Sequence, residues 1–406
     1  MPNRLPTRPF RSLFLTASIT LLLMEVVARS VLASMGLSLP KATQEIERVT
    51  DQARFTFDPA SGYRFSPGPM RWAVFEPNGS PQSLGTVRGN NLGFRDSHDF
   101  HPKRVSSRPR VAVLGDSMSA GVYMPVAWPQ RCQQIAAQRG RAIDVMNFSV
   151  DGGGIMNWWG IITKILGPEN YELDACVLAV CCDDLSRGLF IRHDDVKGSI
   201  HHPWFGRVKG VRADELPSTL DQARRHAFYL PDSEGLTREE MDESLARGRP
   251  LNSELTRSNL IQTLLFAAII GHFRPQGIDA KGESFTTDMV DRIREIGQVL
   301  SSRGIPILVV QIPSPHQQGP AVSLPRGVSI LTQRFAEMLN ADAVDGSRAF
   351  ESVPVDQMRE YFLKGDAHWN QRGADLFASF FESELASWFA KQTTRKDHSA
   401  DSPPGQ

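Results

Sequence analysis

The sequence has little of several features that define specialised protein classes. Its 406 residues include only four cysteines, and 45 Lys and Arg residues are balanced by 45 Asp and Glu residues. A neutral chain lacks the basic field that neutralises phosphates, so we expect no nucleic acid as a partner. No uncharged apolar run reaches the length of about 20 residues that a membrane span needs. With 41% hydrophobic residues, the composition is that of a globular protein, which excludes a wholly disordered chain and a polytopic membrane protein.

The few cysteines are typical of buried thiols. Four cysteines are too few for a disulfide scaffold, and their spacing is not that of a zinc site. Cys181 and Cys182 end an apolar run, so we expect them at the tip of a buried strand. Whether Cys132 and Cys176 form a disulfide is open from the sequence.

The N-terminus reads as a targeting segment, residues 1–37. Arg4, Arg8 and Arg11 precede an uncharged, mostly apolar run from Ser12 to Met24. A basic flank before an apolar stretch is typical of a secretion signal, and the flank stays cytoplasmic by the positive-inside rule.

The sequence is compatible with either cleavage or retention of this segment. Small residues at Val31 and Ala33 would suit a cleaved signal peptide. Glu25 and Arg29 could instead pair on one face of a helix that extends the span, and we favour such an uncleaved signal anchor. A buried amphipathic helix is the third alternative. Both targeting interpretations predict a catalytic domain in the periplasm or outside the cell, either on a single inner-membrane helix or secreted after cleavage.

The rest of the chain divides into an extension, a main domain and a tail. Residues 38–108 are rich in Pro, Gly, Ser and Arg and predict a loop-rich extension with short strands. Residues 109–391 form the expected main domain, interrupted by a polar insertion at about 186–252. The polar residues 392–406 predict a disordered tail.

Within the main domain, continuous apolar runs alternate with helical patterns. Such alternation predicts an α/β fold in which a parallel sheet is covered by helices on both faces. The expected strands are 110–115, 144–150, 173–182 and 306–312, and the expected helices are 129–139, 155–166, 287–302, 328–339 and 371–391.

The first of these strands ends at Ser117, where parallel sheets commonly bind ligands. Far along the chain, Asp366 and His368 precede the last helix. A histidine on such a loop could act as general base for Ser117, with Asp366 orienting the imidazole. The sequence thus predicts a Ser-His-Asp triad.

These residues resemble the SGNH, or GDSL-like, hydrolases, of the membrane-anchored bacterial type. The resemblance covers about residues 85–390 in order. It rests on five blocks, which are Asn90 to Arg95, Gly115-Asp116-Ser117, Trp128-Pro129, Asn147 to Gly154, and Asp366 to Asn370 with Gly373. It implies a three-layer αβα sandwich with a flavodoxin-like sheet, Ser117 as nucleophile, His368 as base and Asp366 as its partner.

The resemblance also implies an oxyanion hole formed by the N–H groups of Ser117 and Gly152 and an Asn side chain. This chain has Asp183 where the family has that Asn. An ionised carboxylate accepts hydrogen bonds and would repel an oxyanion. Asp183 could be protonated through burial, Asn147 or Asn157 could supply the donor, or the enzyme could be weak or inactive.

Several other residues near the motifs are candidates for binding substrate. Asn147, Asn157, Trp158 and Trp369 lie close to the expected catalytic loops, and exposed aromatic rings can stack on sugars. Packing in the core is the alternative for the tryptophans. The histidines of the insertion, His193, His201 and His202, lack the spacing of metal ligands, so we expect no metal and no other cofactor.

Together these observations predict an extracytoplasmic serine esterase that acts on a small-molecule or polysaccharide acyl ester. An O-acetyl group on a saccharide is the expected substrate, by analogy with membrane-anchored relatives. An acyltransferase could use the same triad, and a glycan-binding protein that has lost catalysis is the alternative that Asp183 favours.

Overall fold

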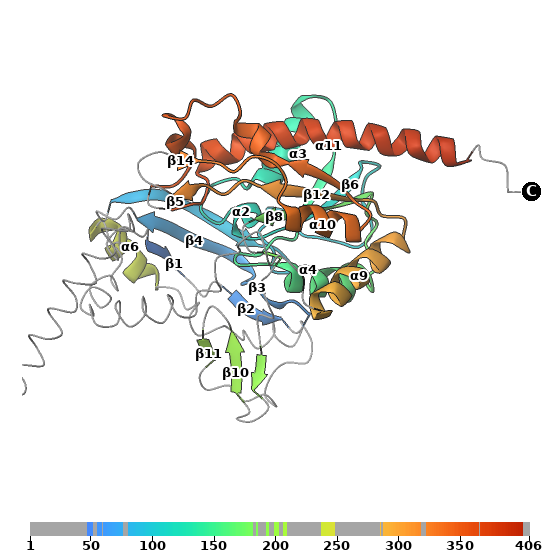
Figure 1. Cartoon of the computed structure of the whole chain (residues 1–406). Coiled ribbons are helices and arrows are strands. Elements are labelled where there is room, and N and C mark those ends of the chain that lie inside the picture. Colours follow the sequence, from blue (N-terminus) through green and yellow to red (C-terminus); the bar gives the residue numbers. More distant parts are fainter. Residues whose placement is uncertain are drawn as a thin grey trace, which may run out of the picture.

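The computed structural model describes most of the main domain and parts of the other segments (Figure 1). The described residues are 47–51, 55–58, 60–75, 80–181, 184–185, 192–194, 199–202, 206–208, 237–247, 285, 287–317, 322–364 and 366–400. The expected targeting segment 1–37 lies outside them, as does much of the insertion. Among the helices that these ranges contain, none has the combined length and apolar character that a membrane crossing requires.

A five-stranded parallel sheet forms the centre of the molecule. In the order of the sheet, its strands are β15 (Asp342–Asp345), β12 (Ile307–Ile312), β8 (Ala175–Cys181), β6 (Arg110–Leu114) and β7 (Asp144–Asn147). Every neighbouring pair runs parallel. The first strand therefore lies between the second and the third, which is the flavodoxin-like order. The expected α/β class and parallel sheet are confirmed.

Helices cover both faces of this sheet, as the alternating sequence pattern predicts (Figure 1). Side chains from β6 alternate between two apolar clusters, with Val111 and Val113 in one and Ala112 and Leu114 in the other. The first cluster is covered by α3 (Trp128–Gln138) and α11 (Gln371–Ala400), and the second by α4 (Ile155–Ile161), α9 (Thr287–Ser301) and α10 (Ile330–Met338). Three layers result, and burial of both sheet faces stabilises them.

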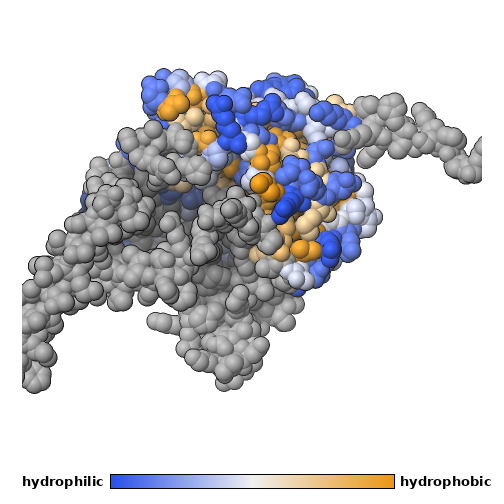
Figure 2. Space-filling model, in the orientation of Figure 1, coloured by the Kyte–Doolittle hydropathy of each residue, from blue (hydrophilic) through white to orange (hydrophobic). Residues whose placement is uncertain are grey.

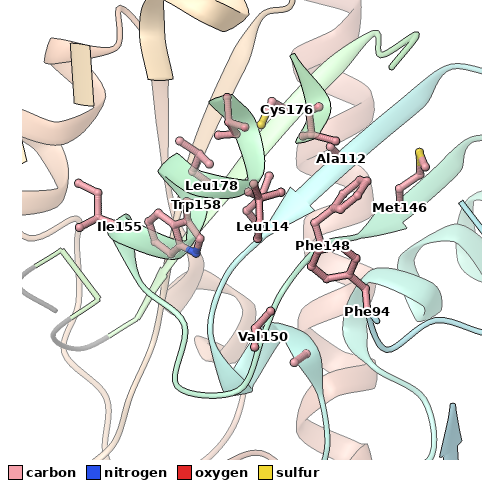
Figure 3. Close-up of a cluster of buried hydrophobic side chains, with 14 of the residues drawn as sticks. Phe94, Ala112, Leu114, Met146, Phe148, Val150, Ile155, Trp158, Cys176 and Leu178 are labelled. Atoms are coloured by element: carbon pink, nitrogen blue, oxygen red, sulfur yellow. The ribbon is translucent and has the colours of Figure 1, made fainter. Parts of the chain in front are cut away.

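The second cluster contains the start of α4. Figure 3 shows Ile155 and Trp158 beside Leu114 and Leu178, on the face of the sheet opposite α3 and α11. The helix continues as the π-helical turn η1 (Ile162–Leu166), so the expected helical range 155–166 is confirmed in extent but not in a single helix type.

Helix α11 extends further than the sequence predicts. It runs from Gln371 to Ala400, so residues 392–400 of the expected disordered tail are helical, and 401–406 lie outside the described residues. Near its centre, Glu382 is 2% exposed and accepts hydrogen bonds from Arg141 at 2.8 and 2.7 Å. Arg139 also donates to Glu382, so α11 is attached to the end of α3 by charged groups.

The N-terminal extension consists of short antiparallel strands. Strands β1 (Glu47–Thr50), β4 (Gly68–Phe75) and β5 (Pro81–Gly89) form one sheet, in the order β1-β4-β5. Strands β2 (Phe55–Asp58) and β3 (Gly62–Phe65) form a hairpin. Its apolar side chains belong to the same cluster as β6 and α4, so the extension shares the core of the main domain.

A buried ion pair and a close backbone contact hold this hairpin in place. Arg64 Nε lies 2.7 Å from Asp58 Oδ2, and both side chains are buried. Burial alone would raise the pKa of Asp58, but the charge and hydrogen bond of Arg64 hold that pKa below its usual value. A Cβ atom at Gly160 would lie 2.0 Å from the carbonyl oxygen of Ala60, so α4 approaches the hairpin in a way that only glycine permits.

The described part of the insertion contains a small sheet and one helix. Its elements are β9 (Arg192–Asp194), β10 (Ser199–His202), β11 (Gly206–Val208) and α6 (Arg238–Arg247). Short elements near the C-terminal half complete the fold, namely β13 (His316–Gln317), β14 (Val322–Ser323), η4 (Gly346–Phe350) and η5 (Met358–Tyr361).

Three cysteines are free thiols buried in the core. Cys132, Cys176 and Cys181 form no disulfide, so no bridge joins Cys132 to Cys176. Burial raises the pKa of Cys176 to about 12. Cys182 lies outside the described residues.

The described surface has few large apolar side chains. Val105, Ile330 and Val355 are exposed, and Figure 2 shows apolar patches bordered by hydrophilic residues. Scattered exposed apolar residues are normal for globular proteins.

Candidate active site

Ser117 begins a short helix directly after strand β6. Helix α2 (Ser117–Ala120) is capped by Asp116, whose side chain accepts a hydrogen bond from the Met118 amide at 2.9 Å. An aspartate is a preferred residue at this position because its carboxylate pairs with an amide that the helix leaves unbonded. The cap fixes the turn that presents Ser117, a residue that is 7% exposed, at the carboxyl edge of the sheet.

His368 lies on a tight loop before α11. The Leu363 amide donates to the carbonyl of His368 at 2.8 Å, and Phe362 and Trp369 form an antiparallel bridge. Trp369 is fully buried and packs 4.7 Å from the ring of Phe377. The buried tryptophan next to His368 therefore anchors the loop in the core.

The structure brings Ser117, His368 and Asp366 together in the order that proton transfer requires. Ser117 Oγ lies 2.7 Å from His368 Nε2, although the two residues are 251 positions apart. Asp366 Oδ1 lies 2.5 Å from His368 Nδ1 and also accepts the His368 backbone amide at 2.9 Å. This network assigns the ring hydrogen to Nδ1, because the carboxylate can only accept, and leaves Nε2 free to take a proton from Ser117.

The loop after β7, which carries Gly152, begins beside Gly115. The Val150 amide donates to the carbonyl of Gly115 at 3.3 Å, which fixes the start of the loop two residues from Ser117. Gly152 has a φ of 71°. Within the described part of the chain, the amides of Ser117 and Gly152 donate to no acceptor.

Asp183 lies outside the described residues. Its neighbours Cys181 and Asp184 are described. Asp184 is fully buried, accepts the Cys181 amide at 2.8 Å, and its carbonyl accepts the Ile155 amide at 3.0 Å. The end of β8 is thus attached to the start of α4.

The expectation that Asn147 or Asn157 supplies an oxyanion donor, or contacts substrate, is wrong. Both are buried, and their side chains bond to the backbone. Asn147 Nδ2 donates to the carbonyl of Ser119 at 2.9 Å, and Asn157 Nδ2 donates to that of Ser61 at 2.6 Å. Asn157 Oδ1 also accepts the Gly154 amide at 3.0 Å. These side chains support the loops instead of facing a ligand.

Substrate stacking by Trp158 and Trp369 is likewise contradicted. Each side chain is fully buried. Trp158 packs 6.2 Å from the ring of Phe335, and Trp369 lies in the cluster covered by α11. Both tryptophans therefore pack in the core, which is the alternative that the sequence analysis gave for them.

Tyr123 is a site residue that sequence reasoning missed. Its ring stands edge-on to His368 with the centroids 4.6 Å apart. Its hydroxyl donates to Asp151 Oδ2 at 3.1 Å. Tyr123 therefore contacts the expected base and the Gly152 loop, but its sequence position in an irregular loop gives no signal of this.

Arg95 is a second residue near the site whose role the sequence does not indicate. It is the last residue of the Asn90 to Arg95 block. Its guanidinium is buried and donates to the carbonyls of Ala120 at 2.9 Å, Met124 at 2.5 Å and Pro125 at 3.2 Å, and to that of Gly121. Burial lowers the pKa of Arg95 to about 9, and nearby Asp96 opposes this shift. The arginine holds the segment between α2 and α3, which includes Tyr123.

The described residues contain no group of three or more His, Cys, Asp or Glu side chains that could hold a metal ion. His193, His201 and His202 lie on β9 and β10 of the insertion.

Comparisons with known proteins give weak similarity. No protein-family model matches the sequence. No curated protein matches it either. Among solved structures, the chain is similar to TesA, with 12% identity, 67% of this chain and 97% of that chain covered, and a TM-score of 0.31.

Two further solved structures are similar to the same extent. The psychrotrophic esterase EstA from Pseudoalteromonas sp. has 12% identity, with 69% of this chain and 98% of that chain covered and a TM-score of 0.32. A lipase/acylhydrolase from Enterococcus faecalis has 12% identity, with coverage of 68% and 95% and a TM-score of 0.34.

Proposed function

We propose that the protein is a serine ester hydrolase of the SGNH type. The observation that carries the proposal is the continuous hydrogen-bonded chain from Ser117 through His368 to Asp366. A structural role alone does not require a hydroxyl, an imidazole and a carboxylate in this order at an accessible strand end. His368 and Asp366 keep 21% and 11% of their side-chain surface exposed, so the chain of groups is reachable from solvent.

The geometry supports a two-step acyl transfer to water. Ser117 Oγ attacks the ester carbonyl while His368 Nε2, at 2.7 Å, takes the hydroxyl proton. His368 then gives that proton to the departing alkoxide, and an acyl-enzyme ester on Ser117 remains. Water attacks this ester with His368 again as base, which releases the carboxylic acid and restores Ser117. Asp366 keeps the imidazole oriented and stabilises its charged form.

The amides of Ser117 and Gly152 are the proposed oxyanion donors. Both lie at the carboxyl ends of neighbouring parallel strands and have no acceptor among the described residues. A fixed donor of this kind stabilises charge that develops only in the transition state. Asp183 stands where the family has a third donor, an Asn side chain. Ester hydrolysis by the Asp183→Asn variant tests whether Asp183 affects the rate.

The substrate class and location belong to the proposal as well. We take an O-acetyl ester on a saccharide as the first natural substrate to test, and the basic and apolar pattern of residues 1–37 supports a periplasmic site anchored in the inner membrane. Acetate release from acetylated and deacetylated polysaccharide tests the first point. Protease accessibility of the main domain in spheroplasts tests the second.

Hydrolysis of p-nitrophenyl acetate by the full chain tests the reaction type. We expect kcat/KM to fall at least about 1,000-fold in Ser117→Ala. Ser379→Ala, which removes a hydroxyl from the exposed side of α11 that accepts from Arg139, is the matched control and should keep full activity. Equal rates in the parent and Ser117→Ala would contradict the proposed function.

A further inference from the structure

The N-terminal hairpin contacts the loop that carries Gly152. Tyr63 of β3 is 1% exposed, and its hydroxyl donates to the carbonyl oxygen of Asp151 at 2.7 Å. The two residues are 88 positions apart. This bond therefore depends on the packing of the extension against the main domain and not on local chain geometry.

The carbonyl of Asp151 and the amide of Gly152 belong to one peptide unit. Because a trans peptide is planar, its C=O and N–H bonds point in opposite directions. A hydrogen bond that fixes the carbonyl of Asp151 therefore fixes the direction of the Gly152 N–H. The same bond polarises the peptide and makes its N–H a stronger donor.

The side chain of Asp151 is held from the opposite side of the site. Tyr123, whose ring contacts His368, donates its hydroxyl to Asp151 Oδ2 at 3.1 Å. Two tyrosines from distant segments thus bind one residue, one through its carbonyl and the other through its carboxylate. The backbone before Gly152 has a restricted orientation as a result.

We propose that Tyr63 is a positioning residue that orients the Gly152 amide as an oxyanion donor, which gives the N-terminal extension a part in catalysis. This inference rests on the proposed function for its reaction. It goes further because it assigns the alignment of the oxyanion site to a hairpin outside the α/β domain. Tyr63 acts through the peptide of Asp151 and does not itself contact substrate.

The test compares Tyr63→Phe with Tyr171→Phe in the full chain. Tyr171 is also fully buried in the same cluster, where its ring packs 5.8 Å from Phe148. We expect kcat for p-nitrophenyl acetate to fall about tenfold in Tyr63→Phe with KM unchanged, because a misdirected donor weakens transition-state binding only. Tyr171→Phe should keep the kcat of the parent. A lower melting temperature of Tyr63→Phe with kcat unchanged would show a structural role only and overturn the inference.

Binding of phenylboronic acid gives a readout that does not need turnover. The boron accepts Ser117 Oγ, the hydroxyl proton passes to His368, and the tetrahedral adduct carries negative charge beside the oxyanion donors. We expect weaker binding to Tyr63→Phe by about the same factor as the loss in kcat, parent-like binding to Tyr171→Phe, and none to Ser117→Ala.

The two proposals can fail separately in this design. Boronate binding that depends on Ser117, in a parent without ester hydrolysis, would overturn the hydrolytic function. Weaker binding to Tyr63→Phe would still support the positioning role in that case, and equal binding would overturn it. A parent that does not bind the boronate would overturn the inference, because no competent oxyanion site then exists.

Discussion

Gln371 holds Val126 by two hydrogen bonds, which join the segment after Ser117 to the helix after His368. The Gln371 side chain accepts the Val126 amide at 2.9 Å and donates to the Val126 carbonyl at 3.1 Å. Gln371 begins α11, shortly after His368, and Val126 lies in the segment between α2 and α3. The contact therefore limits how far His368 and Ser117 can move apart.

Replacing Gln371 by leucine removes both hydrogen bonds to Val126 and should lower both the rate of ester hydrolysis and the stability of the fold. We expect kcat to fall about tenfold, because small displacements of catalytic groups reduce rates strongly, and the free energy of unfolding to fall by about 1–2 kcal/mol. Ester hydrolysis and urea unfolding measure the two quantities. Gln333→Leu, on the exposed side of α10, should alter neither, and an unchanged kcat in Gln371→Leu would show that the contact has no part in alignment.

Asp366→Asn tests the orientation of the imidazole. An asparagine can donate a hydrogen bond to Nδ1, which would place the ring hydrogen on Nε2 and leave Ser117 without a base. We expect kcat to fall about 1,000- to 10,000-fold at neutral pH. Asp345→Asn is the control, since Asp345 accepts the Ser347 amide at the start of η4. Retention of more than about a tenth of the activity in Asp366→Asn would contradict the assigned role.

A comparison of alanine variants at two glycines with the same backbone conformation distinguishes the effect of backbone strain from an effect on catalysis. Gly152 has a φ of 71° and Gly140 a φ of 73°, and a Cβ atom at Gly140 would meet nothing within 4 Å. Alanine at either position should cost about 1–2 kcal/mol of stability, because L-residues disfavour positive φ. Only Gly152→Ala should also lower kcat, since it disturbs the proposed oxyanion donor. Equal kcat values in the two folded variants would argue against that donor.

Glu382 should make stability depend on pH in the acid range. Burial by itself would raise the pKa of Glu382, but hydrogen bonds from Arg141 and Arg139 hold that pKa below the usual 4.5. A carboxylate with a lowered pKa in the folded state contributes stability above about pH 4.5, and this contribution is lost as the pH falls through the lowered value.

We therefore expect the melting temperature of the parent to fall more steeply than that of Glu382→Gln between pH 6 and pH 3. The difference should be modest, because the arginine side chains are 37% and 46% exposed and solvent screens them. Glu337→Gln, at an exposed position of α10, should follow the parent. Parallel curves for the parent and Glu382→Gln would contradict this account.

The α/β class and the approximate positions of four of the five sheet strands can be predicted from local patterns in the sequence. Buried parallel strands are continuous apolar runs, and that signal is local. It does not identify β15, whose residues Asp342–Asp345 are only half buried. It also does not give the end of α11, because the polar composition after Lys391 favours disorder while the helix continues to Ala400.

For the site, the sequence indicated Ser117, Asp366 and His368, because each stands at the end of a strand or the start of a helix where such groups can act. The burial of Asn147, Asn157, Trp158 and Trp369 could not be predicted in this way, since burial depends on which distant elements cover a residue. The contacts of Tyr63 and Tyr123 with Asp151 also depend on that packing. They join segments far apart in the chain, and no local pattern of residues specifies them.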